Sequence, residues 1–155
     1  MIDETQLFTK MAEAHGAIAT DDRALIDAVA ARALARGDSR PNTFVHGDYK
    51  LNNLTVELDR DGCRVSGVFD LHEARFGDGA LDVVRQACGY LDTKPAMARA
   101  FVDSYLGRVA ADARIRELMP LYVINDRMKF WEFSTRPDAR AAWSQGKTFR
   151  DWASR

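Results

Sequence analysis

The feature that most constrains the fold is a change of hydrophobic pattern in the middle of the chain. Residues 40–70 contain short β-forming runs, among them residues 54–58 and 64–69. These two runs flank the turn sequence Asp59-Arg60-Asp61-Gly62, whose Asp-Gly step is a strong β-hairpin signal. On either side of this region, apolar residues recur at helical spacing instead. The pattern predicts a mostly helical α+β fold with a small β-hairpin element.

The spacing of apolar residues predicts the individual helices and strands. Six helices are expected, over residues 4–15, 20–37, 80–91, 95–110, 113–134 and 137–153. Thr20 or Asp21 is expected to cap the second helix, and Pro120 predicts that the fifth is either kinked or divided into two. A short strand is expected at residues 43–45, before the hairpin. One helical face is expected to be apolar, with Ile18, Leu25, Ile26, Val29, Ala33 and Leu34.

Composition narrows the class of protein. The chain has 155 residues, of which 46% are hydrophobic, so one domain over residues 1–155 with a true core is expected. Lys and Arg (22) balance Asp and Glu (23), which argues against a nucleic-acid-binding surface. Neither a signal peptide nor a membrane span is apparent. Cys63 and Cys88 form no disulfide framework, so we expect them to be small buried residues in a cytoplasmic protein.

Chemically distinctive residues are concentrated in a polar loop and at the end of the hairpin. The loop, residues 46–53, contains Asp48, Lys50 and Asn53, and the hairpin ends at Asp70. Carboxylate and amide oxygens suit Mg²⁺ better than zinc or copper, and a lysine can follow a phosphate oxygen. This set of groups is suited to phosphoryl transfer. His72 is expected to have no metal role, because no third soft ligand stands at metal spacing.

Two ordered motifs carry a resemblance to a known family. The sequence His46-Gly47-Asp48-Tyr49-Lys50-Leu51-Asn52-Asn53 resembles the His-Gly-Asp-x-x-x-x-Asn catalytic loop of the aminoglycoside phosphotransferase and choline kinase-like family. Gly67-Val68-Phe69-Asp70-Leu71-His72-Glu73, followed by Gly77, Asp78 and Asp82, resembles the next segment of that family. The resemblance covers residues 40–92 and implies the large, C-terminal lobe of a protein kinase-like fold.

The resemblance also implies roles for individual residues. Asp48 would be the catalytic base, and Lys50 would lie against the transferred phosphate. Asn53 and Asp70 would hold Mg²⁺, Asp70 binding the ion that bridges the phosphates of ATP. His46 and Asp82 would be structural. Asp82 would hold the loop in place through hydrogen bonds from backbone N–H groups. Asp78 would be either structural or a third carboxylate near the metal.

The chain departs from the family's pattern before the loop. Only 45 residues precede His46; they are predicted to be helical and contain no glycine-rich run. We therefore expect a C-terminal lobe without its N-terminal nucleotide lobe. In a complete kinase the nucleotide lobe covers apolar surface of the C-terminal lobe. If this surface is left exposed, it would favour a homodimer or binding to a separate nucleotide-lobe chain.

Three functions remain open from the sequence. The first is Mg²⁺-dependent transfer of the ATP γ-phosphoryl group to a hydroxyl of a small molecule. The second is a catalytically idle kinase-like lobe that acts as a binding or interaction module. The third is a metal-dependent phosphohydrolase, which needs only water as the acceptor.

Overall fold

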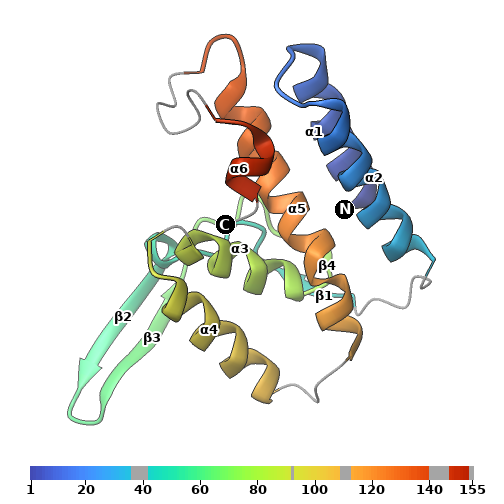
Figure 1. The fold of residues 1–155 in the computed structure, drawn as a ribbon. Helices are drawn as coiled ribbons and strands as arrows, with labels where there is room; N and C mark the ends of the chain where they lie inside the picture. The colour runs from blue at the N-terminus through green and yellow to red at the C-terminus, as the bar shows by residue number, and fades with distance from the viewer. Residues whose placement is uncertain (36–41, 92, 109–112, 140–146, 154–155) are drawn as a thin grey trace. The chain divides into compact units, whose positions relative to one another are not determined.

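The structure is a computed structural model that describes residues 1–35, 42–91, 93–108, 113–139 and 147–153. Its contacts form two compact units, one of Met1–Asp38 with Ala111–Arg155 and the other of Ser39–Ala110. The described residues have a mostly helical α+β fold with two small antiparallel sheets (Figure 1). The predicted fold class is confirmed at this level. None of the described helices is long and apolar enough to cross a membrane.

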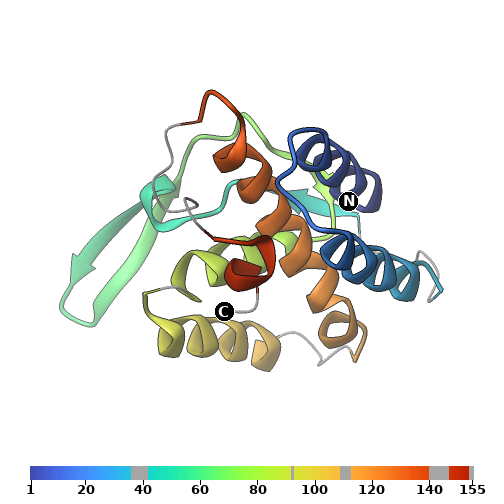
Figure 2. The same ribbon diagram turned by 45° about the horizontal axis from the view of Figure 1, so that its top comes forward.

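The first unit contains four described helices. They are α1 (Ile2–Ala14), α2 (Thr20–Leu34), α5 (Ala113–Thr135) and α6 (Phe149–Ala153). Helix α5 packs against the other three (Figure 2). Its buried Trp131 stacks on Trp152, and the indole N–H donates to the carbonyl of Ala17 at 2.8 Å. The core of this unit is made by Ala12, Ile26, Ile124, Met128, Trp131, Phe149 and Trp152.

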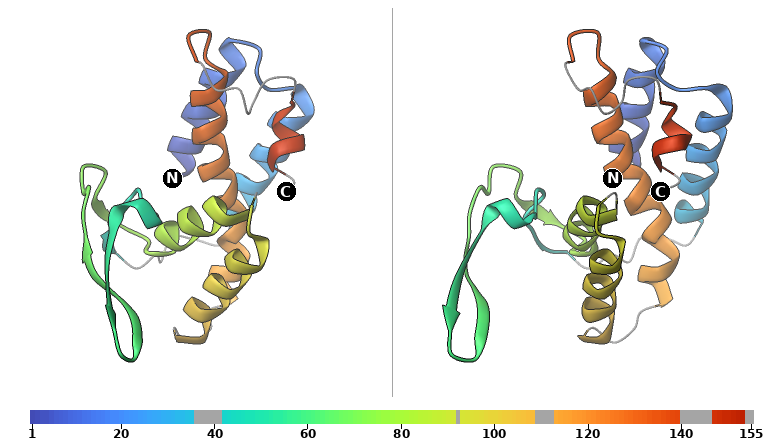
Figure 3. Two further views of the ribbon diagram at one scale, coloured as in Figure 1. Left: turned by 90° about the vertical axis from the view of Figure 1, so that its left-hand side faces the viewer. Right: turned by 60° about the vertical axis from the view of Figure 1, so that its left-hand side comes forward.

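The described residues of the second unit form the strands and two α-helices. Strand β1 (Thr43–Val45) pairs with β4 (Arg75–Gly77), and β2 (Leu54–Asp59) pairs with β3 (Gly62–Val68), both antiparallel. A single 3-10 turn, η1 (Leu51–Asn53), precedes β2. Helices α3 (Ala80–Leu91) and α4 (Pro95–Arg108) pack together. The β2–β3 hairpin extends away from α3 and α4 (Figure 3).

The hairpin is amphipathic, and both of its faces are largely exposed. Register places apolar residues opposite one another, in the pairs Leu54–Val68, Val56–Val65 and Leu58–Cys63. Directly opposed residues lie on the same face, so these pairs form one apolar face. Glu57 and Arg64, which form an ion pair, face each other on the other side. Leu58 is 81% exposed, so none of the described residues of the unit covers the outer part of the apolar face.

Several local predictions are wrong. Ala19, not Thr20 or Asp21, is the N-cap of α2, and its N–H donates to the Asp22 carboxylate at 3.4 Å. Of the two outcomes predicted for Pro120, division into two helices is excluded, because α5 is one continuous helix that includes this proline. Packing of α5 against neighbouring helices stabilises it despite the missing backbone bond. Cys63 is exposed because it lies on the projecting hairpin, whereas Cys88 is buried as expected.

The helix predicted over residues 137–153 is also wrong in part. Its described residues are helical only in Phe149–Ala153, and residues 140–146 lie outside the described part of the chain. Thr148 and Asp151 make reciprocal side-chain to backbone hydrogen bonds of 3.1 and 3.0 Å. This capping box starts the helix at Phe149. The end predicted for α2, at Gly37, and that predicted for α4, at Ala110, also lie outside the described residues.

The predicted apolar face of α2 is narrower than expected. Ile26, Ala30 and Ala33 are buried, while Leu25 and Leu34 are exposed. The three buried positions are separated by four and three residues, so they form one stripe along the helix.

Candidate active site

Helix α3 holds the loop that follows β1. Asp82, in the first turn of α3, accepts the N–H of His46 at 2.7 Å through Oδ2 and the N–H of Gly47 at 2.9 Å through Oδ1. Hydrogen bonds to a carboxylate are stronger than neutral ones, and a carboxylate is favoured in the first turn of a helix. One side chain therefore fixes the start of the loop.

Gly47 lets the loop pass close to another backbone segment. Its φ is +85°, in the left-handed region that favours glycine. A Cβ at this position would lie 2.5 Å from the carbonyl oxygen of Glu73. The turn after His46 thus depends on the absence of a side chain.

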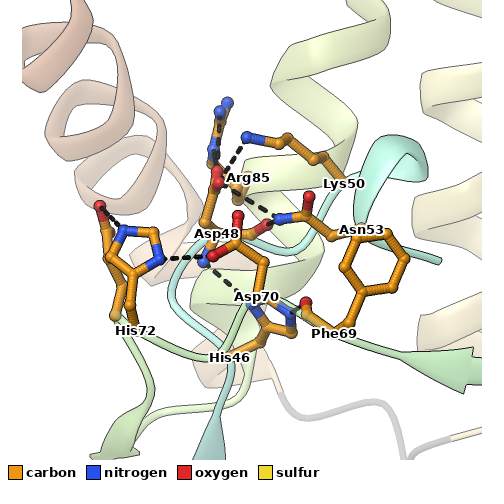
Figure 4. Close-up of polar contacts among 9 residues, drawn as sticks. His46, Asp48, Lys50, Asn53, Phe69, Asp70, His72 and Arg85 are labelled. Atoms are coloured by element: carbon orange, nitrogen blue, oxygen red, sulfur yellow. Dashed lines mark hydrogen bonds and ion pairs between the residues drawn. The ribbon is translucent and has the colours of Figure 1, made fainter.

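Backbone and imidazole hydrogen bonds connect the loop to the end of the hairpin. The N–H of Phe69 donates to the carbonyl of Asn53 at 3.1 Å, and His46 Nε2 lies 2.9 Å from the carbonyl oxygen of Phe69. His46 Nδ1 accepts the N–H of Asp48 at 3.3 Å, so Nε2 carries the proton and donates. Because Asp70 follows Phe69, these bonds place Asp70 beside the loop (Figure 4).

Asp48 lies among three side-chain donors. Lys50 Nζ forms an ion pair with Asp48 Oδ2, and the amide nitrogen of Asn53 is 3.3 Å from the same oxygen. Arg85, on α3, approaches Oδ1 with Nε at 3.3 Å and Nη2 at 3.2 Å. The Asp48 side chain is only 14% exposed, so these charges act through a partly buried environment.

The two cations determine the charge state of Asp48. Burial alone would raise the pKa of this carboxyl group, because it disfavours the ionised form. The hydrogen bond from Lys50, then the charge of Arg85, outweigh burial and hold the pKa of Asp48 below its ordinary value. Asp48 is therefore ionised at neutral pH.

Asn53 and Asp70 offer oxygens of the kind that bind Mg²⁺. The Asn53 amide nitrogen faces Asp48, lying 3.0 Å from its carbonyl oxygen, so the amide oxygen is the atom that can face a cation. Asp70 has a φ of +65°, and its side chain is 43% exposed. Within the described part of the chain, no three His, Cys, Asp or Glu side chains group as metal ligands. Two hard oxygen donors suit Mg²⁺, which completes its coordination with waters and substrate phosphates.

Asp78 lies at the start of α3. It is buried, and its Oδ1 accepts the N–H of Ala80 at 3.0 Å. This contact with the first residue of α3 is of the kind that a helix-capping residue makes. The sequence left open a structural role and that of a third carboxylate near the metal.

Sequence reasoning missed two side chains of this site. Arg85 is three residues after Asp82, so both lie on one face of α3, but the contact of Arg85 with Asp48 depends on how α3 is oriented against the loop. The sequence was tested only for a metal role of His72, and its contact with Asp70, in which Nδ1 lies 2.6 Å from Oδ1, was not predicted. Its spacing of two residues from Asp70 carries no comparable signal.

Substitution of Gly47 tests the close approach of the loop to Glu73. We expect Gly47→Ala to destabilise the protein by about 1–3 kcal/mol or more, because it adds a strained backbone and a clash. Gly89→Ala is the control, since Gly89 is helical with nothing within 4 Å of an added Cβ. It should stabilise the protein by about 0.5–1 kcal/mol. Denaturant unfolding measures both; equal effects would contradict the loop geometry.

The charge state of Asp48 can be measured by carboxyl-carbon NMR titration. We expect its pKa to lie below the ordinary value and to rise in Lys50→Met and in Arg85→Gln. Because the folded-state pKa is lowered, the stability that Asp48 contributes is present above the ordinary carboxyl pKa. It is lost as the pH falls through the folded-state value. Lys94→Met, at an exposed position of the same unit, should leave the titration unchanged; an equal rise there would refute the assignment.

Comparison with known proteins bears on the family to which the chain belongs. A search of curated proteins finds no match to the chain. A family model described as the phosphotransferase enzyme family matches residues 3–118, which include the loop, the hairpin and α3. The chain therefore belongs to this phosphotransferase family, as the resemblance of its two motifs to aminoglycoside phosphotransferases predicted.

Proposed function

We propose that this protein transfers the γ-phosphoryl group of ATP to a hydroxyl group of a small molecule, with Mg²⁺ as cofactor. Family membership supports phosphoryl transfer in general. The observation that carries the specific proposal is the connection between the two motifs. Asn53 and His46 both bond to Phe69, which brings the Asp48 loop and Asp70 to one place.

Asp48 is the proposed base. Its ionised carboxylate would orient the acceptor hydroxyl and take its proton. The acceptor oxygen would form a bond to the γ-phosphorus as the bond to the β–γ bridging oxygen breaks, and ADP would leave with that electron pair. Lys50, beside Asp48, would attract an oxygen of the transferred group.

Asn53 and Asp70 are the proposed metal ligands. Mg²⁺ would neutralise the charge of the phosphates. Asp70 is exposed enough to reach a bound nucleotide, and the Asn53 amide is oriented by Asp48. The short contact of His72 with Asp70 leaves the second carboxylate oxygen for the ion.

The proposal treats residues 40–92 as the catalytic part of a kinase-like C-terminal lobe. The remaining contacts to the nucleotide would then come from outside residues 40–92, for example from a separate nucleotide-lobe chain or from a second copy of this protein. Sedimentation of the purified chain alone distinguishes a homodimer from a monomer.

One observation favours the alternative of an idle lobe that serves as an interaction module. The apolar hairpin face exposes Val56, Leu58 and Val65. Exposed apolar surface of this kind is typical of protein-binding sites. An idle lobe would need this surface but would not need Asp70 to bind metal.

Calorimetric titration of Mg·ATP into the full chain separates the two functions. We expect binding by the wild type and at least a tenfold weakening in Asp70→Asn, because the variant loses the anionic metal ligand. Asp103→Asn, an equal change of charge at an exposed position of α4, is the control and should bind as the wild type does.

The Mg·ATP titration can contradict the proposed function in more than one way. Equal affinities of the wild type and Asp70→Asn would contradict a metal–nucleotide site at Asp70 and favour the idle lobe. No binding by a folded wild type would mean that this chain does not hold the nucleotide unaided, which leaves a kinase that needs a second chain or the idle lobe. Binding with release of inorganic phosphate, but with no phosphorylated acceptor, would identify a phosphohydrolase instead.

A further inference from the structure

The β2–β3 hairpin lacks the support that an isolated hairpin needs. A two-stranded hairpin is at best marginally stable in water by itself, and further strands or a packed helix stabilise it. In the described part of the chain, β2 pairs with β3 and with no other strand. The apolar side chains of Val56, Leu58 and Val65 are exposed. A further strand along one edge would therefore stabilise the hairpin.

The two outer edges of the hairpin differ. Strand β3 contains a bulge: Val56 pairs with Val65 and Thr55 with Gly67, so Ser66 is an extra residue. A bulge bends its strand and disrupts the ladder, which protects an edge against further pairing. Strand β2 has no extra residue, no proline and no lysine, and it is the strand farther from α4 in Figures 1 and 2. A further strand would therefore fit on the outer edge of β2.

The sequence of β2 is symmetric about its centre. Leu54, Val56 and Leu58 lie on the apolar face of the strand. Thr55 and Glu57 lie on the opposite face. If two copies of this strand pair antiparallel about a two-fold axis at Val56, Val56 faces its own copy and Leu54 faces Leu58 of the second copy. In this register every apolar residue of the strand is matched with an apolar residue.

The same register keeps like charges apart. Glu57 is the only charged residue in the run 54–58. It faces Thr55 of the second copy rather than another Glu57, and within its own copy it forms an ion pair with Arg64 on β3. Directly opposed like charges destabilise a sheet, and within this run the register has none. The edge of β2 is therefore complementary to itself in both charge and hydrophobicity.

We propose that a second copy of this chain pairs with the outer edge of β2, antiparallel and centred on Val56. The two hairpins then form one four-stranded sheet whose apolar face is continuous across both copies, and whose outer strands are the bulged β3 strands. A sheet of this size with an apolar face has the support that the single hairpin lacks. The contact is the same on both copies, so it closes as a dimer. The inference does not depend on the proposed catalytic function.

Sedimentation equilibrium of the full chain measures the association. The run of five residues is short beside the about 20–30 residues that each partner contributes to a standard interface. We therefore expect a weak, reversible dimer with a dissociation constant of about 1–100 µM. A wild type that stays monomeric up to about 1 mM would leave this edge to a partner of another kind and overturn the inference.

Two lysine variants identify the edge that pairs. Val56→Lys introduces like charges directly opposite each other, because the two Val56 Cα atoms lie about 4.5–5.5 Å apart across the axis. Val65→Lys makes the same change on the same face, at a position that is 51% exposed against 56% for Val56. The two Val65 positions are three strand spacings apart, about 14 Å, where salt screens their charges. We expect at least tenfold weaker dimerisation in Val56→Lys and at most threefold in Val65→Lys; equal weakening would overturn the inference.

Mixing variants of opposite charge locates the two-fold axis. Val56→Lys and Val56→Glu should each be monomeric at concentrations where the wild type dimerises. An equimolar mixture of the two should form a heterodimer, because opposite charges then face each other across the axis. The matched mixture of Val65→Lys and Val65→Glu should associate no more tightly than either variant alone. Folded Val56 variants that stay monomeric when mixed would contradict the register.

Disulfide cross-linking tests the register without a new charge. The background for both variants is Cys63→Ser, which removes the exposed native thiol. Val56→Cys should form an intermolecular disulfide under mild oxidation, because Cα atoms about 4.5–5.5 Å apart are within disulfide reach. Val65→Cys should cross-link at least tenfold more slowly. Equal or faster cross-linking through Val65 would indicate that β3 edges pair or that apolar faces stack, and would overturn the inference.

Discussion

The candidate site depends on the two hydrogen bonds that Asp82 accepts from consecutive backbone N–H groups. With His46 and Gly47 held at 2.7 and 2.9 Å, the loop begins at a fixed point on α3. His46 is then positioned to donate to the carbonyl of Phe69, which holds the segment that leads to Asp70. A hydrogen bond to a charged group contributes about 1.5–3 kcal/mol, so one carboxylate can supply much of the order of this loop.

The same helix supplies both structure and charge to the loop. Asp82 accepts hydrogen bonds from the backbone, and Arg85, about one turn later, contacts the side chain of Asp48. Burial opposes ionisation of Asp48, but Lys50 and Arg85 together overcome it. The result is an ionised carboxylate with a cation at each oxygen, an arrangement suited to hold a hydroxyl group near anionic phosphate.

Sequence reasoning succeeded where local signals are strong. The Asp-Gly step with its β-forming flanks predicts the hairpin, and helical periodicity predicts α3 with the bounds that the structure has. Strand β4 has no local signal, because Arg75–Gly77 is short and is a strand only through its pairing with β1. Arg85 was missed because its place in the site follows from the orientation of α3, which is a tertiary property.

The most direct test of this account is paramagnetic broadening of backbone amide NMR signals by Mn²⁺ in the presence of ATP. If Asn53 and Asp70 hold the cation, their amide signals and those of adjacent residues should broaden first, and Asp70→Asn should abolish the effect. The hairpin turn at Asp59 and Asp61 offers carboxylates without the amide oxygen of Asn53. Broadening centred on that turn, or unchanged in Asp70→Asn, would contradict the account.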